Sequence, residues 1–201
     1  EEARASLVAW HHITDPKLVE IGAFTKEEQK DIVEAMYLLE LQGQMIQLRN
    51  AKGEDVLREA HDRADQLIFE YLRENTQGFE VVETGGNYYV KILDIDALHR
   101  GSGALLKIVH EAKATGDTKT VDAMMEKYGN RFNKKWRNNI VARAKKAGLP
   151  ELVAMTFPKM VPVIKNGKVV NVTLDNTESF AAQHLRFGKI SKTTKIDEEY
   201  Q

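Results

Sequence analysis

The chain has 201 residues, of which 42% are hydrophobic and 29% charged, a composition that indicates a globular protein of one or at most two domains. Its 29 lysines and arginines nearly balance 30 aspartates and glutamates, so the net charge gives no argument for binding nucleic acid or a membrane. The absence of cysteine excludes disulfides, cysteine-ligated zinc and thiol nucleophiles, and no apolar run reaches the ~20 residues of a membrane span. A reducing compartment is permitted, and we expect a cytoplasmic protein.

The first third of the chain predicts helices. Residues 1–13 read as part of a helix that begins without an initiating methionine, and we expect the true N-terminus of the protein to be missing. A capping box, Thr25 with Glu28, predicts the start of a long helix. Apolar residues at helical spacing predict another helix over 54–74.

Two segments change to the two-residue period of strands. Residues 79–93 predict a β-hairpin that turns at Gly85-Gly86-Asn87, and residues 160–174 predict a second one. The second turn is Asn166-Gly167, a pair that suits a type I′ turn.

Helical patterns return between and after the hairpins, over 97–114, 120–128, 134–147 and 177–187, and the tail 189–201 is polar and expected to be poorly ordered. The Gly101-Ser102-Gly103 sequence is interpreted as a turn, because it lacks the lysine and the preceding strand of a phosphate-binding loop. The predicted fold class is α+β, predominantly α-helical, with two small β-hairpins.

Three short stretches carry a resemblance to a known family. Residues 1–5 read Glu-Glu-Ala-Arg-Ala, residues 43–48 read Gly-Gln-Met-Ile-Gln-Leu, and residues 59–61 read Glu-Ala-His. They resemble the Glu-Glu-x-Arg-Ala-Glu/Asp, Gly-Leu-Met-x-Gln-Leu and Glu-Ala-His-Met segments of the dipeptidyl-peptidase III family of zinc peptidases. Weaker likeness extends over most of the chain, and residues 1–188 are identified as the C-terminal part of such a catalytic domain.

The resemblance implies roles for four side chains. Glu2 takes the position of the third zinc ligand, and Glu1 takes the position of a group that hydrogen-bonds to a ligand. His61 takes the position of a histidine that faces the substrate cleft, and Arg186 that of an arginine that holds the peptide's terminal carboxylate. If both roles apply, His61 and Arg186 should face one groove shared with the first helix. From the residues alone, the alternatives are exposed N-terminal glutamates, a boundary histidine and a solvated helix arginine.

The chain departs from the family pattern in ways that bear on activity. Ser6 and Asp65 replace an acid and an arginine, and Arg63 is two positions too early to substitute. The family's His-Glu-x-x-x-His motif is absent, since His110-Glu111 has no second histidine one turn later and the adjacent His11-His12 diverge around a helix. We therefore expect zinc in the intact parent, none bound to this chain alone, and a missing N-terminal half as its partner, with a peptide as the substrate.

Two other functions stay open. The parent can have lost catalysis, so that this part is a binding or scaffold module, as Ser6 and Asp65 allow. Alternatively, basic residues over 127–146, with Trp136 among them, can bind nucleic acid, although charge runs on short helices are usually solvated faces. Leu7, Val8 and Trp10 of the first helix are expected to lie uncovered and to invite self-association.

Overall fold

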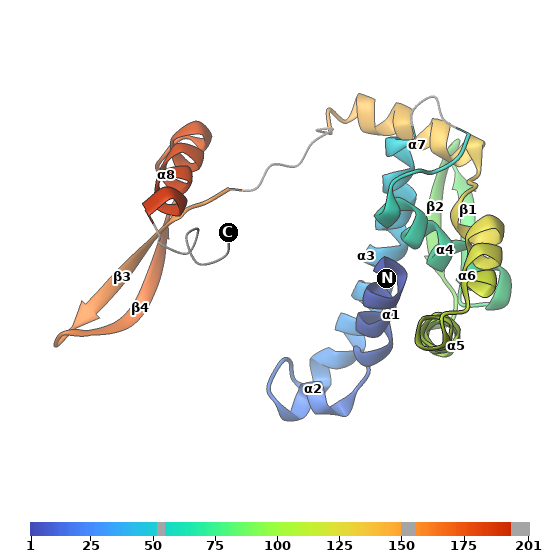
Figure 1. The fold of residues 1–201 in the computed structure, drawn as a ribbon, viewed down its shortest axis with the longest axis horizontal. Helices are drawn as coiled ribbons and strands as arrows, with labels where there is room; N and C mark the ends of the chain where they lie inside the picture. Colours follow the sequence, from blue (N-terminus) through green and yellow to red (C-terminus); the bar gives the residue numbers. More distant parts are fainter. Residues whose placement is uncertain (52–54, 150–155, 194–201) are drawn as a thin grey trace. The chain divides into compact units, whose positions relative to one another are not determined.

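The computed structural model describes residues 1–51, 55–149 and 156–193. The chain divides into two compact units, Glu1–Leu149 and Pro150–Gln201, and each is described by itself (Figure 1). The predicted fold class is confirmed: the described residues are mainly helical, with two antiparallel two-stranded sheets. Within these ranges no helix combines the length and the apolar character that crossing a membrane requires.

The first unit contains a series of helices interrupted by one hairpin. Its elements in chain order are α1 (Glu2–His12), α2 (Pro16–Glu20), α3 (Lys26–Gln47), a 3-10 turn η1 (Leu48–Asn50), α4 (Ala60–Asn75), β1 (Phe79–Thr84), β2 (Asn87–Ile92), α5 (Ile95–Thr115), α6 (Thr118–Met124), a π-helical turn η2 (Met125–Gly129) and α7 (Lys134–Lys146). Strands β1 and β2 pair in register from Phe79 opposite Ile92 to Thr84 opposite Asn87. The hairpin predicted over 79–93 is therefore confirmed.

Side-chain caps decide where the long helices begin. The predicted capping box at α3 is present, because Thr25 and Glu28 each hydrogen-bond to the other's backbone nitrogen. Helix α4 begins at Ala60, so the start predicted near residue 54 is wrong. The cause is Glu59, whose carboxylate accepts from the backbone nitrogens of His61 and Asp62 and so fixes the first turn.

Helix α1 is part of the core of the first unit. It packs against α5 and α4, and Leu7 and Trp10 are almost completely buried, at 0% and 2% exposure. The Trp10 ring meets Tyr37 of α3 edge to face, and the Tyr37 hydroxyl donates to the Trp10 carbonyl at 3.1 Å. The expectation of uncovered side chains is therefore wrong for Leu7 and Trp10, because α3 and α5 of the same chain cover them, and it holds only for Val8.

The Gly101-Ser102-Gly103 sequence lies inside α5, so its interpretation as a turn is wrong. A Cβ at Gly101 would lie 2.4 Å from Thr76 Cγ2, and one at Gly103 would lie 2.9 Å from His11 Nδ1. The Ser102 side chain is fully buried and lies 3.3 Å from the Tyr37 hydroxyl. These small residues allow α5 to approach α4 and α1 closely, which explains glycine in a helix interior.

The second unit contains a hairpin and a helix. Strands β3 (Lys159–Lys165) and β4 (Lys168–Asp175) confirm the hairpin predicted over 160–174. Asn166 and Gly167 both have positive φ, 50° and 72°, as a type I′ turn requires. Helix α8 (Phe180–Thr193) starts later than predicted and continues past residue 189, while 194–201 of the predicted tail lies outside the described residues.

Candidate functional site

The first turns of α1 and α4 bring two of the candidate residues together. Glu2 is in the first turn of α1 and His61 in the first turn of α4. The Glu2 Oε2 atom lies 3.1 Å from His61 Nε2, so the histidine faces the first helix. The His61 side chain is 67% exposed, which leaves the pair accessible from solvent.

Glu59 orients the His61 ring from its other side. One Glu59 oxygen lies 2.8 Å from His61 Nδ1, while the second oxygen caps α4. This hydrogen bond, with the charge of Glu2 as the next cause, raises the pKa of His61. When protonated, the ring can donate from both nitrogens, to Glu59 and to Glu2. The sequence analysis did not assign this role to Glu59, because glutamate is not among the residues usually preferred at a helix N-cap.

Glu1 points to a different neighbour. Its carboxylate pairs with Arg4 at 2.9 Å and with Lys113 of α5, and these two cations hold its pKa at about 2. In this structure the Glu1 carboxylate therefore links α1 to α5, whereas the Glu2 carboxylate contacts His61 of α4. This agrees with the roughly 100° that separates adjacent positions on a helix.

Other carboxylates lie near His61 on the side of α3 and α4. Asp65, which stands where the family has an arginine, is partly buried, and desolvation raises its pKa to about 6. A hydrogen bond from Gln47 opposes this shift, while the nearby charges of Glu40 and Asp62 add to it. Desolvation also raises the pKa of Glu40 and Asp62. The wall beside His61 is thus acidic, where an arginine would have made it basic.

Asp65→Asn is expected to stabilise the first unit at alkaline pH. A carboxyl whose folded pKa lies above its unfolded value costs stability once it ionises, so wild-type stability from this group falls as pH rises from about 4 to about 6. After allowance for solvent screening, the gain is about 1–2 kcal/mol at pH 8 and close to zero at pH 4. Urea unfolding at both pH values measures it, and Asp31→Asn on the exposed side of α3 is the matched control. Equal changes for the two variants at pH 8 would contradict the assignment.

Arg186 belongs to the second unit and is held there. Its guanidinium binds Glu178 at 2.8 Å and the Phe157 carbonyl at 2.5 Å, so it is not a freely solvated helix arginine. Because His61 lies in the first unit, the groove expected to join the two residues stays a prediction. The assignment of 1–188 to one catalytic domain stays a prediction as well.

The donors in this chain do not fit a complete zinc site. A catalytic zinc needs three protein ligands and a position for water. Among residues 1–51, 55–149 and 156–193, no group of three or more histidines, aspartates and glutamates is arranged to hold a metal ion. Glu2 and His61 are two donors at most. His11 stacks in parallel on His99, with ring centroids 4.9 Å apart, so these rings do not converge on one point either.

The basic residues over 127–146 are largely engaged within the first unit. Four of these cations form ion pairs: Lys127 with Glu74, Arg131 with Glu126, Lys134 with Asp55 and Lys135 with Glu83. Trp136 packs against the core aromatic residues Phe69 and Tyr88. These contacts occupy four of the basic side chains and the Trp136 ring within the described residues, and nucleic-acid binding stays an alternative without a supporting observation.

Comparison with known protein families gives a match over most of the chain. The sequence model described as peptidase family M49 matches residues 1–179. No curated protein matches the chain. The matched range contains Glu1, Glu2 and His61 and ends directly before α8. It covers the greater part of the sequence. The chain therefore belongs to peptidase family M49, the dipeptidyl-peptidase III family.

Proposed function

We propose that this chain forms one wall of a peptide-hydrolysing zinc site and supplies Glu2 as one ligand of the metal. The observation that carries the proposal is the Glu2–His61–Glu59 chain. In it, Glu59 at the start of α4 hydrogen-bonds to one nitrogen of the His61 ring, and the other nitrogen contacts Glu2 at the start of α1. Family M49 is zinc-dependent in general, and the two remaining ligands would come from a His-Glu-x-x-x-His segment outside these 201 residues. We also propose a cytoplasmic location, which the cysteine-free sequence permits.

The residues of this chain would act on the peptide through position and charge. Glu59 holds the His61 ring in one orientation, so a proton on Nε2 points to Glu2 in the absence of substrate. A peptide carbonyl oxygen at the same place would replace Glu2 as the acceptor of this proton. The acidic wall formed by Asp65, Glu40 and Asp62 would favour a peptide with a positive charge nearby, such as a free N-terminus.

The first test uses the chain alone. With only one family ligand and no preplaced histidines, it is expected to retain no stoichiometric zinc at ~1 μM and to hydrolyse no peptide, since affinity arises from three or four converging ligands. The measurements are bound metal after gel filtration and hydrolysis of a chromogenic dipeptide substrate. Chelator-sensitive hydrolysis that co-purifies with the chain and is lost in Glu2→Ala would show a complete site within it.

The second test joins the chain to a family segment that carries His-Glu-x-x-x-His. The joined protein is expected to bind one zinc and to release dipeptides, and Glu2→Ala should lower kcat/KM by about a thousandfold or more, because an open metal site loses one of three ligands. Glu20→Ala, which removes an exposed glutamate of α2, is the control and should leave kcat/KM unchanged. A joined protein that binds zinc and peptide but cleaves nothing would favour the scaffold alternative instead.

A further inference from the structure

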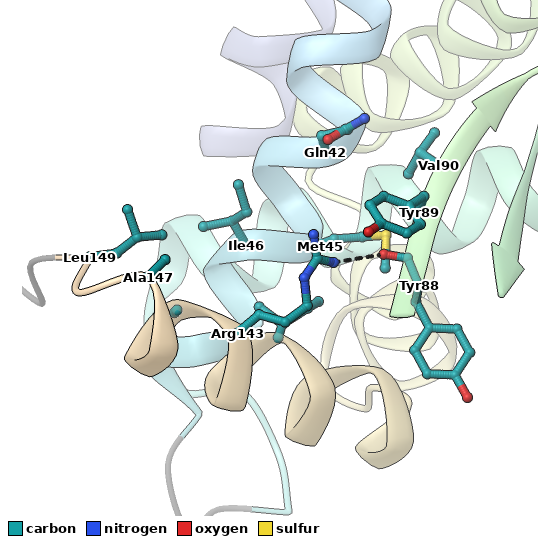
Figure 2. Close-up of a pocket in the computed structure, with 11 residues that line it drawn as sticks. Gln42, Met45, Ile46, Tyr88, Tyr89, Val90, Arg143, Ala147 and Leu149 are labelled. Atoms are coloured by element: carbon teal, nitrogen blue, oxygen red, sulfur yellow. Dashed lines mark hydrogen bonds between the residues drawn. The ribbon is translucent and has the colours of Figure 1, made fainter. Parts of the chain in front are cut away.

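A pocket of about 200 Å³ lies in the first unit between the end of α3, strand β2 and the end of α7 (Figure 2). Its walls are mainly apolar and are formed by Met45, Ile46, Tyr89, Val90, Ala147 and Leu149. Ile46 and Leu149 remain 43% and 48% exposed, so the apolar walls are open to a ligand from solvent. The pocket shares no residue with the Glu2–His61–Glu59 chain.

One cation stands in the middle of these walls. Figure 2 shows the Arg143 side chain rising from α7 between Ile46 and Tyr89. Its Cζ atom lies 4.6 Å from the centroid of the Tyr89 ring, and its Nη1 donates to the Tyr88 carbonyl at 3.1 Å. A contact with the ring does not use up the N–H groups of the guanidinium, which stay available to an acceptor.

The charge of Arg143 has no counter-ion in the described part of the chain. The single hydrogen bond to Tyr88 uses one of the five N–H groups that a guanidinium carries. Among the described residues no aspartate or glutamate lines the pocket, and Gln42 is its only polar side chain besides Arg143 and the two tyrosines. A positive charge among apolar walls attracts an anion more strongly than one in open water does.

We propose that this pocket binds a monocarboxylate with a compact branched aliphatic body, its carboxylate on Arg143 and its body against Met45, Ile46 and Leu149. A planar carboxylate matches the guanidinium fork with two parallel hydrogen bonds. One cation balances one negative charge, so a phosphate dianion would be left half compensated among apolar groups. The volume is below the ~300–1,000 Å³ of drug-sized sites and fits a ligand of about the size of leucine.

The same chemistry can come from a free short-chain acid or from the leucine-like C-terminal end of a peptide. Titration of the ¹⁵N-labelled 201-residue chain at low salt with 4-methylpentanoate, N-acetyl-leucine and N-acetyl-leucinamide distinguishes them. The acids are expected to shift the amide signals of lining residues with a Kd on the order of 1 mM. The uncharged amide should bind at least about tenfold more weakly, because it cannot form the charge-assisted pair.

The two acids also identify the source. Equal binding of both assigns the pocket to the free carboxylate, and binding of N-acetyl-leucine alone assigns it to a peptide end. Shifts that are absent from the lining residues, or an amide that binds as well as its acid, would overturn the proposal.

Variants locate the binding on Arg143. Arg143→Gln should weaken binding about tenfold or more, while Lys146→Gln, which removes the same charge from an exposed position one turn later on α7, should change the Kd less than about twofold. Ile46 is 43% exposed, so Ile46→Glu is compatible with folding, and it sets a carboxylate beside the guanidinium. It should therefore abolish binding even if Arg143→Gln disturbs the Tyr88 contact. Wild-type affinity in a folded Ile46→Glu variant would refute the site.

Discussion

Replacing Trp10 with alanine is expected to lower the free energy of unfolding of the first unit by about 3–5 kcal/mol, the usual cost of emptying a large aromatic site in a core. Trp10 is 2% exposed, and its ring packs edge to face on Tyr37 with centroids 5.5 Å apart. Removing the indole leaves a cavity between α1 and α3 and removes the aromatic contact. The total free energy of unfolding of a domain is only about 5–15 kcal/mol, so the expected loss is a large fraction of it.

Urea unfolding followed by circular dichroism measures the loss in the whole chain. Val8→Ala is the matched control, because Val8 lies on the same helix at 42% exposure and its loss should cost less than about 0.5 kcal/mol. A Trp10→Ala variant within about 1 kcal/mol of wild type would contradict the packing of α1 described above. If the free energy of unfolding falls with urea concentration at the same slope in both proteins, the substitution acts on the folded state.

Gly101→Val is expected to destabilise the first unit by about 3 kcal/mol through overpacking. A Cβ at this position would lie 2.4 Å from Thr76 Cγ2 and 2.9 Å from Leu72 Cδ2. Thr76 cannot simply rotate away, because its hydroxyl donates to the Leu72 carbonyl at 2.6 Å and accepts from the Gly78 nitrogen at 3.1 Å. Relief therefore requires α4 and α5 to separate or these bonds to break.

Gly43→Val provides the comparison for that variant. Gly43 also lies inside a helix, α3, but a Cβ there meets no heavy atom within 4 Å. The same substitution should therefore change stability by less than about 0.5 kcal/mol, since helix propensity slightly favours valine over glycine. Thermal unfolding of both variants measures the difference. If both lose the same stability, the cost of valine arises from its place inside a helix and not from the contact of Gly101 with α4.

Local signals predicted the elements whose causes are local. The capping box at Thr25 and the turn at Asn166-Gly167 depend on neighbouring residues, and both were predicted correctly. The start of α4 was predicted too early because the cap formed by Glu59 was overlooked. The glycines of α5 were misread because their reason lies in α4 and α1, which are distant in the sequence.

The candidate site shows the same division. Helical spacing placed His61 near the edge of a buried stripe, but its position beside Glu2 depends on how α1 packs against α4. Only the family resemblance pointed to both residues. The burial of Trp10 could not be predicted because the covering side chain, Tyr37, belongs to another helix whose orientation no local pattern gives.

Glu59 begins α4 with one oxygen and holds the His61 ring with the other. Evolution therefore cannot adjust the two tasks independently at this position. A shorter residue such as serine can still start the helix, yet it cannot reach the imidazole, and the ring would then be free to turn. A lineage that gave up peptide cleavage could accept that exchange without losing its fold, so the residue at position 59 in relatives would record whether selection still acts on the histidine or only on the helix.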